Sequence, residues 1–207
     1  MASRRSRQSP STAPTAADRL APARRPAGYA RRVTGAPQTD AEFHVARAAT
    51  SQISATIIEE VAAWGASEGF PSWTAGSFTG PDSIGVSRLL GDIATGSLYL
   101  LWRGADAVAT FSLLERDSLF WPDAGDEALY LHRFAVRRTA AGAGRHAVEW
   151  CLHEARRRGR LFVRLDCLAE NPGIRRYYER FGFTAINERV VNGIRYSLCE
   201  VAVARQT

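Results

Sequence analysis

The chain has 207 residues, 45% of them hydrophobic, which is enough for one medium-sized packed domain with extensions. Its formal charge of +6 is unevenly distributed: residues 1–38 hold eight Arg and one Asp, a net +7, whereas residues 39–207 hold 19 Arg and 20 acidic residues, a net −1. A nearly neutral body argues against a nucleic-acid-binding function, because that function depends on cations neutralising phosphates.

The cysteines and the hydropathy pattern exclude several further classes. Cys151, Cys167 and Cys199 form no CxxC pair and have no His at metal-ligand spacing, so the sequence predicts no zinc site, no disulfide framework and no metal cofactor. No apolar run reaches the roughly 20 residues of a membrane span, and the N-terminus lacks the apolar core of a secretory signal. We therefore expect a soluble, cytoplasmic protein without a membrane or nucleic-acid partner.

The chain divides at about residue 38. Residues 1–38 are dominated by Ala, Arg, Pro, Ser and Thr and have almost no large aliphatic side chains to bury. Such a composition cannot offset the entropy of ordering, so we expect a disordered tail rich in Arg, Ala and Pro. Residues 39–207 are expected to form the folded domain.

The first half of the domain is predicted to contain a strand, two helices and a hairpin. Apolar residues recur at helical spacing from Ser51 to about Glu68, and Gly69 follows as a stop signal. A loop rich in Gly and Pro separates this helix from the next. The predicted elements are a strand over Phe43–Arg47, helices over Ser51–Glu68 and Pro81–Ile93, and strands over Ser97–Trp102 and Ala107–Leu114.

The second half is predicted to contain a β-α-β unit and a final hairpin. In the strand Ala128–Val136, the alternation places Leu131 and Arg133 on one face and His132 and Phe134 on the other. Asn192-Gly193 is a hairpin turn signal. The remaining predicted elements are a helix over Arg145–Arg158, a strand over Leu161–Cys167, a short helix over Pro172–Arg180, and strands over Thr184–Val190 and Ile194–Val203.

Small residues gather between Arg137 and Gly144, where the strand ending at Val136 turns into the following helix. Such a turn lets backbone N–H groups approach a ligand, and these groups together with the positive helix end favour phosphate oxygens. The segment is thus a candidate diphosphate cradle. The structural alternative is that Gly142 and Gly144 only allow tight packing of the strand against the helix.

Four features together resemble the core of the GNAT N-acetyltransferase superfamily: Leu131–Val136, the Gly142-Ala143-Gly144 turn, Asn171, and Tyr178–Phe183. The resemblance is strongest over residues 128–183 and extends weakly over about 43–203. It implies an α/β (α+β) GNAT fold, with a central mixed, mostly antiparallel sheet of about six to seven strands flanked by helices.

The resemblance also implies acetyl-CoA as cosubstrate. The strand would offer backbone groups to the pantetheine arm and the acetyl carbonyl, and the turn would bind the diphosphate. Asn171 would meet the pantetheine or the helix behind it. The chain departs from the family pattern at Thr139, where Gln or Arg is usual, and Arg138 or Arg145 would supply the missing cation. The implied cofactor residues are Phe134, Ala135, Val136, Thr139, Gly142, Ala143, Gly144, Arg145 and Asn171.

Tyr178 matches the family's general acid. A phenol of pKa about 10 can protonate a thiolate whose conjugate acid has a pKa of about 8.5, if the site tunes the pair. The alternative is that Tyr177 and Tyr178 simply pack. For the base that deprotonates the amine we rank Glu115 first and His132 second among three candidates that also include Asp166. Their structural alternatives are a solvated strand end for Glu115, a core position for His132, and an ion pair with Arg164 or Arg133 for Asp166.

The function that this resemblance implies is transfer of an acetyl group from acetyl-CoA to a primary amine of a small molecule or peptide, by direct attack. The protein would act as a monomer or homodimer. The alternative is a non-catalytic, acyl-CoA-binding GNAT-like module that serves as a sensor or partner domain, which the departure at Thr139 favours slightly. A thiol nucleophile at Cys167 lacks a matching His and carboxylate pattern. The acceptor pocket is expected to be aromatic, drawing on Phe70, Trp73, Phe78, Phe120 and Trp121.

Overall fold

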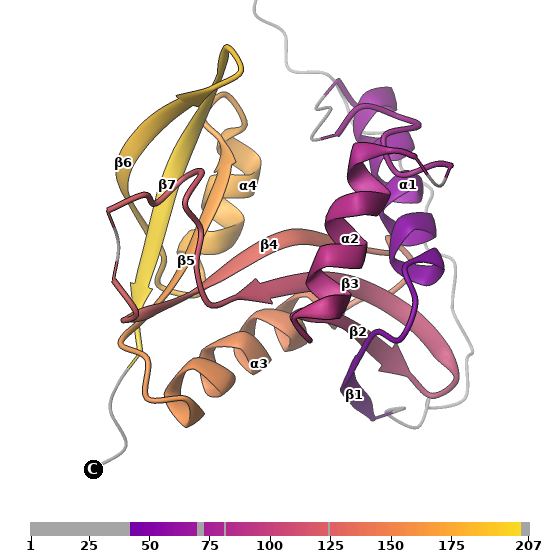
Figure 1. Cartoon of the computed structure of the whole chain (residues 1–207), viewed down its shortest axis with the longest axis horizontal. Coiled ribbons are helices and arrows are strands. Elements are labelled where there is room, and N and C mark those ends of the chain that lie inside the picture. The colour runs from indigo at the N-terminus through magenta and orange to yellow at the C-terminus, as the bar shows by residue number, and fades with distance from the viewer. Residues whose placement is uncertain (1–41, 70–72, 81, 124, 204–207) are drawn as a thin grey trace, which may run out of the picture. The chain divides into compact units, whose positions relative to one another are not determined.

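The computed structural model of the chain describes residues 42–69, 73–80, 82–123 and 125–203 (Figure 1). All of them belong to one compact unit, Thr39–Thr207. The predicted tail over residues 1–38 lies outside the described residues and stays a prediction. None of the helices among the described residues has the length and apolar character needed to cross a bilayer.

A seven-stranded mixed sheet forms the centre of the domain, with strand order β1-β2-β3-β4-β5-β7-β6. Only β4 and β5 pair in parallel, and every other neighbouring pair is antiparallel. The predicted mixed, mostly antiparallel sheet is therefore confirmed. The strands are β1 (Phe43–Arg47), β2 (Leu98–Arg103), β3 (Asp106–Leu114), β4 (Ala128–Val136), β5 (Phe162–Leu168), β6 (Thr184–Val191) and β7 (Ile194–Ala202).

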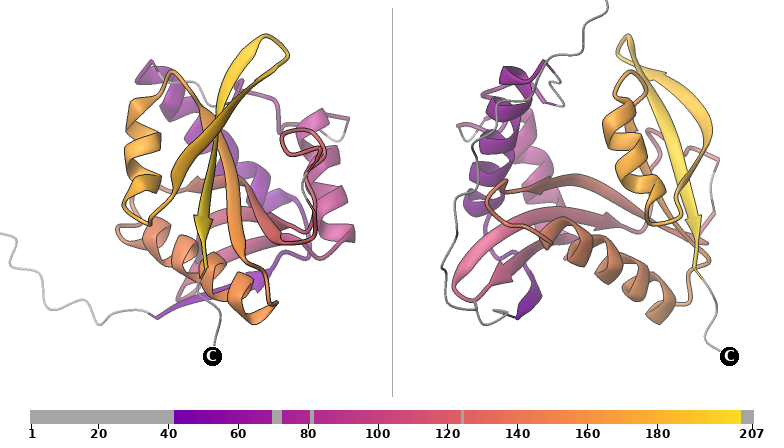
Figure 2. Two further views of the ribbon diagram at one scale, coloured as in Figure 1. Left: turned by 90° about the vertical axis from the view of Figure 1, so that its left-hand side faces the viewer. Right: turned by 180° about the vertical axis from the view of Figure 1, so that it is seen from behind.

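Four helices cover the two faces of the sheet (Figures 1 and 2). One core lies between the sheet and α3 with α4, and includes Leu129, Leu131 and Leu165; a smaller core lies beneath α1 and α2, and includes Ile57 and Leu89. The helices are α1 (Gln52–Ser67), α2 (Ile84–Ala94), α3 (Ala143–Arg157) and α4 (Pro172–Glu179). Each predicted helix is present, with its ends shifted by up to three residues.

The start of α3 differs from the prediction in a way that matters for the site. Arg145 was expected to begin the helix, but Ala143 and Gly144 are already helical and Gly142 is the N-cap, with φ of 84°. This left-handed backbone is accessible to glycine because it has no Cβ. The two residues expected in the turn therefore form the first turn of α3 itself.

The parallel pairing of β4 and β5 is short. It joins only Ala128–Leu131 to Phe162–Leu165, and both strands continue beyond it without pairing to each other. Figure 1 shows the two strands diverging from this point. The backbone edges of β4 and β5 that face each other beyond Leu131 and Leu165 are thereby left without a partner strand, and α3 begins just after the free end of β4.

A β-bulge interrupts β4 at the same place. Ser112 pairs with His132 and Thr110 with Ala135, so two β4 residues, Arg133 and Phe134, lie opposite the single β3 residue between Thr110 and Ser112. Arg133 has φ of 49°. The predicted strict alternation along β4 is therefore wrong, because the extra residue places Arg133 on the same face of the sheet as His132.

We predict that Leu129→Ala destabilises the domain by about 2–5 kcal/mol, because Leu129 is fully buried between the sheet and α3 and its truncation leaves a cavity. Leu90→Ala makes the same chemical change at a side chain that is 51% exposed, and should alter the free energy of unfolding by no more than about 0.5 kcal/mol. Urea titrations of both variants test the assignment of the core. Equal losses would contradict it.

Candidate active site

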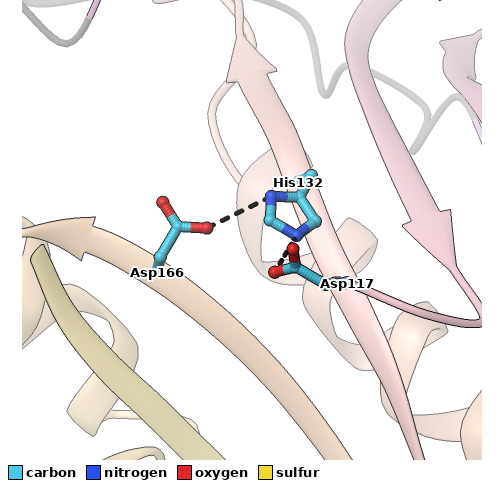
Figure 3. A group of neighbouring side chains, drawn as sticks. All are labelled: Asp117, His132 and Asp166. Carbon is cyan, nitrogen blue, oxygen red and sulfur yellow. Dashed lines mark hydrogen bonds and ion pairs between the residues drawn. The ribbon is translucent and has the colours of Figure 1, made fainter. Parts of the chain in front are cut away.

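Three side chains meet where β4 and β5 diverge (Figure 3). His132 and Asp166 are the first residues beyond the last β4–β5 pair, and Nδ1 of His132 lies 3.1 Å from Oδ1 of Asp166. Nε2 of His132 lies 3.0 Å from Oδ2 of Asp117, which comes from the loop after β3. The side chains of His132, Asp117 and Asp166 are 11%, 6% and 15% exposed, so the group is largely shielded from solvent.

Asp117 ties the β3–β4 loop to His132. Its Oδ1 accepts hydrogen bonds of 3.1 Å from the backbone N–H groups of Leu119 and Phe120, while its Oδ2 contacts the imidazole. The turn that results places the ring of Phe120 6.0 Å from that of His132 and 5.0 Å from that of Tyr196 on β7. One carboxylate therefore fixes both the loop and the histidine.

The two carboxylates keep His132 charged. Burial alone would lower the pKa of His132, but Asp117 and Asp166 outweigh it and raise the pKa to about 9. Burial would likewise raise the pKa of Asp117, yet the contact with His132 and the backbone donors lower it. At neutral pH the histidine is thus an imidazolium between two carboxylates, and the group carries a net negative charge.

The same three residues also have the side-chain types of a metal site. The two carboxylates, however, contact opposite nitrogens of one imidazole ring, and a histidine protonated on both nitrogens has no lone pair to offer a cation. The arrangement among these described residues therefore fits an ion-paired histidine better than a metal centre.

The structure differs from one predicted assignment, Glu115 as the base, and from the structural alternative considered for Asp166. Glu115 follows Leu114, which pairs with Tyr130, so it lies beside the segment where β4 and β5 are paired, and its carboxylate contacts Arg158 and Arg160. It belongs to a structural ion-pair network and not to the group around His132. Asp166, for its part, contacts His132 and neither of its predicted partners, because Arg164 pairs with Glu127 and Glu200, and Arg133 pairs with Asp92.

Tyr178 on α4 is buried beside β5. Burial raises the pKa of its phenol well above 10, and Tyr177, Cys167 and Asp166 act in the same direction. The phenol consequently stays protonated at physiological pH, as a proton donor must. The contact of Cys167 with Cys199 and its burial raise the pKa of the Cys167 thiol, so the thiolate that a cysteine nucleophile needs is disfavoured.

The first turn of α3 is open to an anion. Gly142 has no side-chain cap, and no acidic residue lies in the first turn. A Cβ on Gly144 would come within 2.5 Å of the hydroxyl of Tyr177, so a larger residue there would displace that phenol from the helix start. Thr139 is exposed in the preceding loop, and Arg145 pairs with Glu149 at 2.7 Å on the helix surface. The guanidinium of Arg138 stacks 4.0 Å from the ring of Trp64.

The other predicted cofactor residues border the opening or cap a helix. Asn171 is the N-cap of α4, and its Oδ1 accepts from the N–H groups of Gly173 and Ile174 at 3.0 and 3.1 Å. Phe134, Ala135 and Val136 form the free end of β4, with Phe134 packed edge-on against the ring of Phe111. Asn171 thus has a structural role that leaves its NH₂ group free for other use.

The predicted aromatic residues separate into two groups. Trp73 and Phe78 pack beneath α1 and α2, whereas Phe120 lies beside His132. Trp121 stacks on Arg164 at 4.9 Å and lines, with Phe120, a cavity of about 600 Å³ against β6 and β7. Phe70 lies outside the described residues.

A model described as the acetyltransferase (GNAT) family matches residues 56–183, a span that includes the bulge, the start of α3 and Tyr178. The chain belongs to this family. Among curated proteins, an uncharacterized N-acetyltransferase, YesJ, from Bacillus subtilis (strain 168) is 29% identical over 134 residues, which cover 61% of this chain and 72% of that protein.

Solved GNAT structures share the fold. A GNAT-family acetyltransferase from Listeria monocytogenes 4b F2365 superposes with a TM-score of 0.60 at 22% identity, covering 77% of this chain and 94% of that one. The yncA acetyltransferase from Salmonella typhimurium, solved with its cofactor acetyl-CoA, superposes with a TM-score of 0.56 at 16% identity, covering 79% and 95%. At these identities the likeness concerns the fold alone.

Sequence reasoning missed two carboxylates. Asp117 lies 15 positions before His132, in a loop whose course the pattern did not predict. Its signal was the Asp-Ser-Leu-Phe turn, since Asp commonly accepts from N–H groups two and three residues ahead. Asp92 was missed because an acidic residue in an amphipathic helix is usually exposed to solvent. Arg133 was assigned to the wrong face of the sheet because the bulge was not recognised.

The pKa of His132 generates a prediction about stability. Folding raises the pKa of His132 from 6.5 to about 9. Protonation of His132 therefore stabilises the native state by at most about 3 kcal/mol. This stabilisation is fully present below about pH 6.5 and is lost as the pH rises through 9. The free energy of unfolding, measured by urea titration across that interval, should fall in the wild type and fall less in His132→Gln. His153→Gln, on the exposed side of α3, should keep the wild-type decline; identical profiles for all three proteins would contradict the ion-paired assignment.

Proposed function

We propose that this GNAT-family protein transfers an acetyl group from acetyl-CoA to a primary amine of a small molecule or peptide, in the cytoplasm and without a metal. The observation that carries the proposal is the position of the His132–Asp166 contact. It lies at the point where β4 and β5 diverge, on the same strand that leads into the open first turn of α3. A proton-accepting group and an anion cradle thus border one opening.

The residues around this opening suit acyl-CoA. The uncapped N–H groups at the start of α3 favour the diphosphate, and Arg145 and Arg138 add positive charge nearby. The unpaired edge of β4 from Phe134 to Val136 offers backbone groups to an extended chain such as pantetheine. When bound, acyl-CoA would supply an activated thioester that an amine attacks with release of the thiolate. The acetyl-CoA bound to the yncA protein supports this choice of cosubstrate.

The net negative charge of the Asp117–His132–Asp166 group attracts an ammonium ion, and the ring of Phe120 adds an aromatic wall beside it. Because His132 is protonated at neutral pH, Asp166 is the better acceptor of the amine proton there. His132 orients Asp166 and becomes a second proton acceptor above about pH 9. This assignment keeps His132 in the site and replaces Glu115 by Asp166.

Tyr178 completes the proposed reaction as the general acid. Its phenol is protonated throughout the physiological range and belongs to the buried cluster that includes Leu165 and Cys167 of β5, and in this proposal it delivers a proton to the departing thiolate. Direct attack needs no covalent enzyme intermediate, which agrees with the suppressed thiolate of Cys167. The acceptor enters, in this proposal, from the face that carries α2 and the β3–β4 loop.

Acetyl-CoA binding is the first test. Gly144→Glu places a carboxylate and a side chain where the hydroxyl of Tyr177 and the diphosphate must fit, so micromolar binding by isothermal titration should be lost. Gly91→Glu adds the same charge on α2 with no atom in its way and should bind as the wild type does. A wild type that fails to bind would sink the proposal, whereas binding without transfer to any of a broad panel of amines would favour the sensor alternative.

The roles of Tyr178 and Asp166 predict kinetic losses. Tyr178→Phe and Asp166→Asn should each lower kcat by about 100-fold or more, with the KM for acetyl-CoA nearly unchanged, because each removes a proton transfer and not a binding contact. Tyr177→Phe is the matched comparison on the same helix. Its hydroxyl lies over the start of α3, so its removal should affect the KM for acetyl-CoA more than kcat. A Tyr178→Phe enzyme with the wild-type kcat would place the acid elsewhere.

A further inference from the structure

The bulge in β4 has an arginine where glycine is the usual residue. Bulges with a left-handed first residue favour glycine because that backbone brings a Cβ too close to the following carbonyl oxygen. Arg133 adopts this backbone, with φ of 49°. An L side chain in such a conformation is strained, so its presence calls for a reason that lies in the side chain.

The side chain of Arg133 joins three elements. Its Nε lies 2.8 Å from Oδ2 of Asp92 on α2 and 3.1 Å from Oγ of Ser112 on β3, and its NH2 group also contacts Asp92. The hydroxyl of Ser112 donates to the same carboxylate oxygen. We call Asp92, Ser112 and Arg133 the bulge clamp, because together they connect α2, β3 and the left-handed residue of β4.

Stability alone does not account for the bulge clamp. Asp92 is 8% exposed and lies in the last turn of α2, where the helix dipole disfavours a negative charge. Removing a carboxylate and a guanidinium from water costs about as much as their attraction returns, so a buried ion pair is weak support for stability. The strained backbone of Arg133 and the carboxylate of Asp92 at an unfavourable helix end are both unfavourable, and the two residues contact each other.

That point adjoins the candidate active site. His132 immediately precedes Arg133, and the β4 edge that faces β5 has no partner strand beyond Leu131. A slip of one residue in β4 would turn each following side chain to the other face and move the free backbone groups along the opening. The bulge clamp prevents this slip, because it attaches the extra residue itself to α2.

We propose that Asp92 and Arg133 are positioning residues for acyl transfer: their ion pair holds the β4 bulge so that its unpaired backbone groups face the thioester carbonyl and His132 faces Asp166. The inference rests on the proposed acetyl transfer. It adds a residue of α2, Asp92, to those that determine the geometry of the site, although α2 lies outside the strands and loops that border the opening. In this inference Asp92 and Arg133 act through the geometry of β4, because their polar contacts are with each other and with Ser112.

The test compares two glycine variants. Arg133→Gly frees the left-handed backbone of strain but removes the bulge clamp, while Asn192→Gly makes the same change in the β6–β7 turn, where Asn192 has φ of 51°. Arg133→Gly should lose about 100-fold in kcat, as expected for a small misplacement of the reacting groups. It should also lose the difference in affinity between acetyl-CoA and CoA, because only the former has a carbonyl to hold. Asn192→Gly should match the wild type in both.

A double variant guards against a trivial failure. Arg133→Gly leaves Asp92 buried without its cation, whereas Asp92→Asn with Arg133→Gly leaves no stranded charge and should fold. The same loss of kcat and of acetyl-CoA discrimination in a folded double variant supports the positioning role. Wild-type kinetics in either folded variant would overturn it, even if the melting temperature falls.

Amide hydrogen exchange separates this inference from the proposed function. The N–H groups of residues 132–135 should exchange at least about tenfold faster in the double variant than in the wild type or in Asn192→Gly, since the bulge opens once it is untied from α2. Unchanged protection overturns the inference. If the wild type neither binds nor acetylates, the proposed acetyl transfer is what fails, and the exchange rates still decide whether the ion pair holds the bulge.

Discussion

The short parallel pairing of β4 and β5 is the constraint on which the rest of the domain depends. Four residue pairs join the two strands, and beyond them the sheet separates into two parts, β1–β4 and β5–β7, that no longer share backbone pairing. The residues of the candidate active site lie along the strand edges that this divergence leaves without a partner strand. His132 and Asp166 stand at its base, and the start of α3 stands at its far end.

The charged side chains near the opening form two small clusters, each centred on one buried cation. His132 is shared by Asp117 and Asp166, and Arg133 is shared by Asp92 and Ser112, so each buried cation has a fixed set of acceptors. Such groups specify geometry more than they add stability, because desolvation offsets most of their attraction. The imidazolium of His132 therefore fixes the positions of Asp117 and Asp166 beside the open edge of β4.

The sequence predicted what local patterns determine. Periodicity located every helix and strand, and the spacing from Asn171 to Tyr178 placed both residues at α4. It failed where distant residues meet. Sequence alone could not show that Arg158 and Arg160, 43 and 45 positions away, pair with the carboxylate of Glu115, the first-ranked base. The bulge could not be recognised in the sequence, because an arginine that adopts a positive φ looks like any other strand residue. Without the bulge, Arg133 was assigned to the opposite face of the sheet, and its contact with Asp92 could not be predicted.

The turn made by Asp117 has a consequence for how such a protein can diversify. Asp117 supplies the polar contact of the β3–β4 loop with His132 on β4, and from Phe120 onward the loop also packs against β7 and lines a cavity with residues of β6 and β7. Length and composition can therefore drift in the part of the loop after Phe120 without disturbing the charge around His132. Changes in that part of the loop would thus reshape the cavity against β6 and β7 while Asp117 keeps its contact with His132.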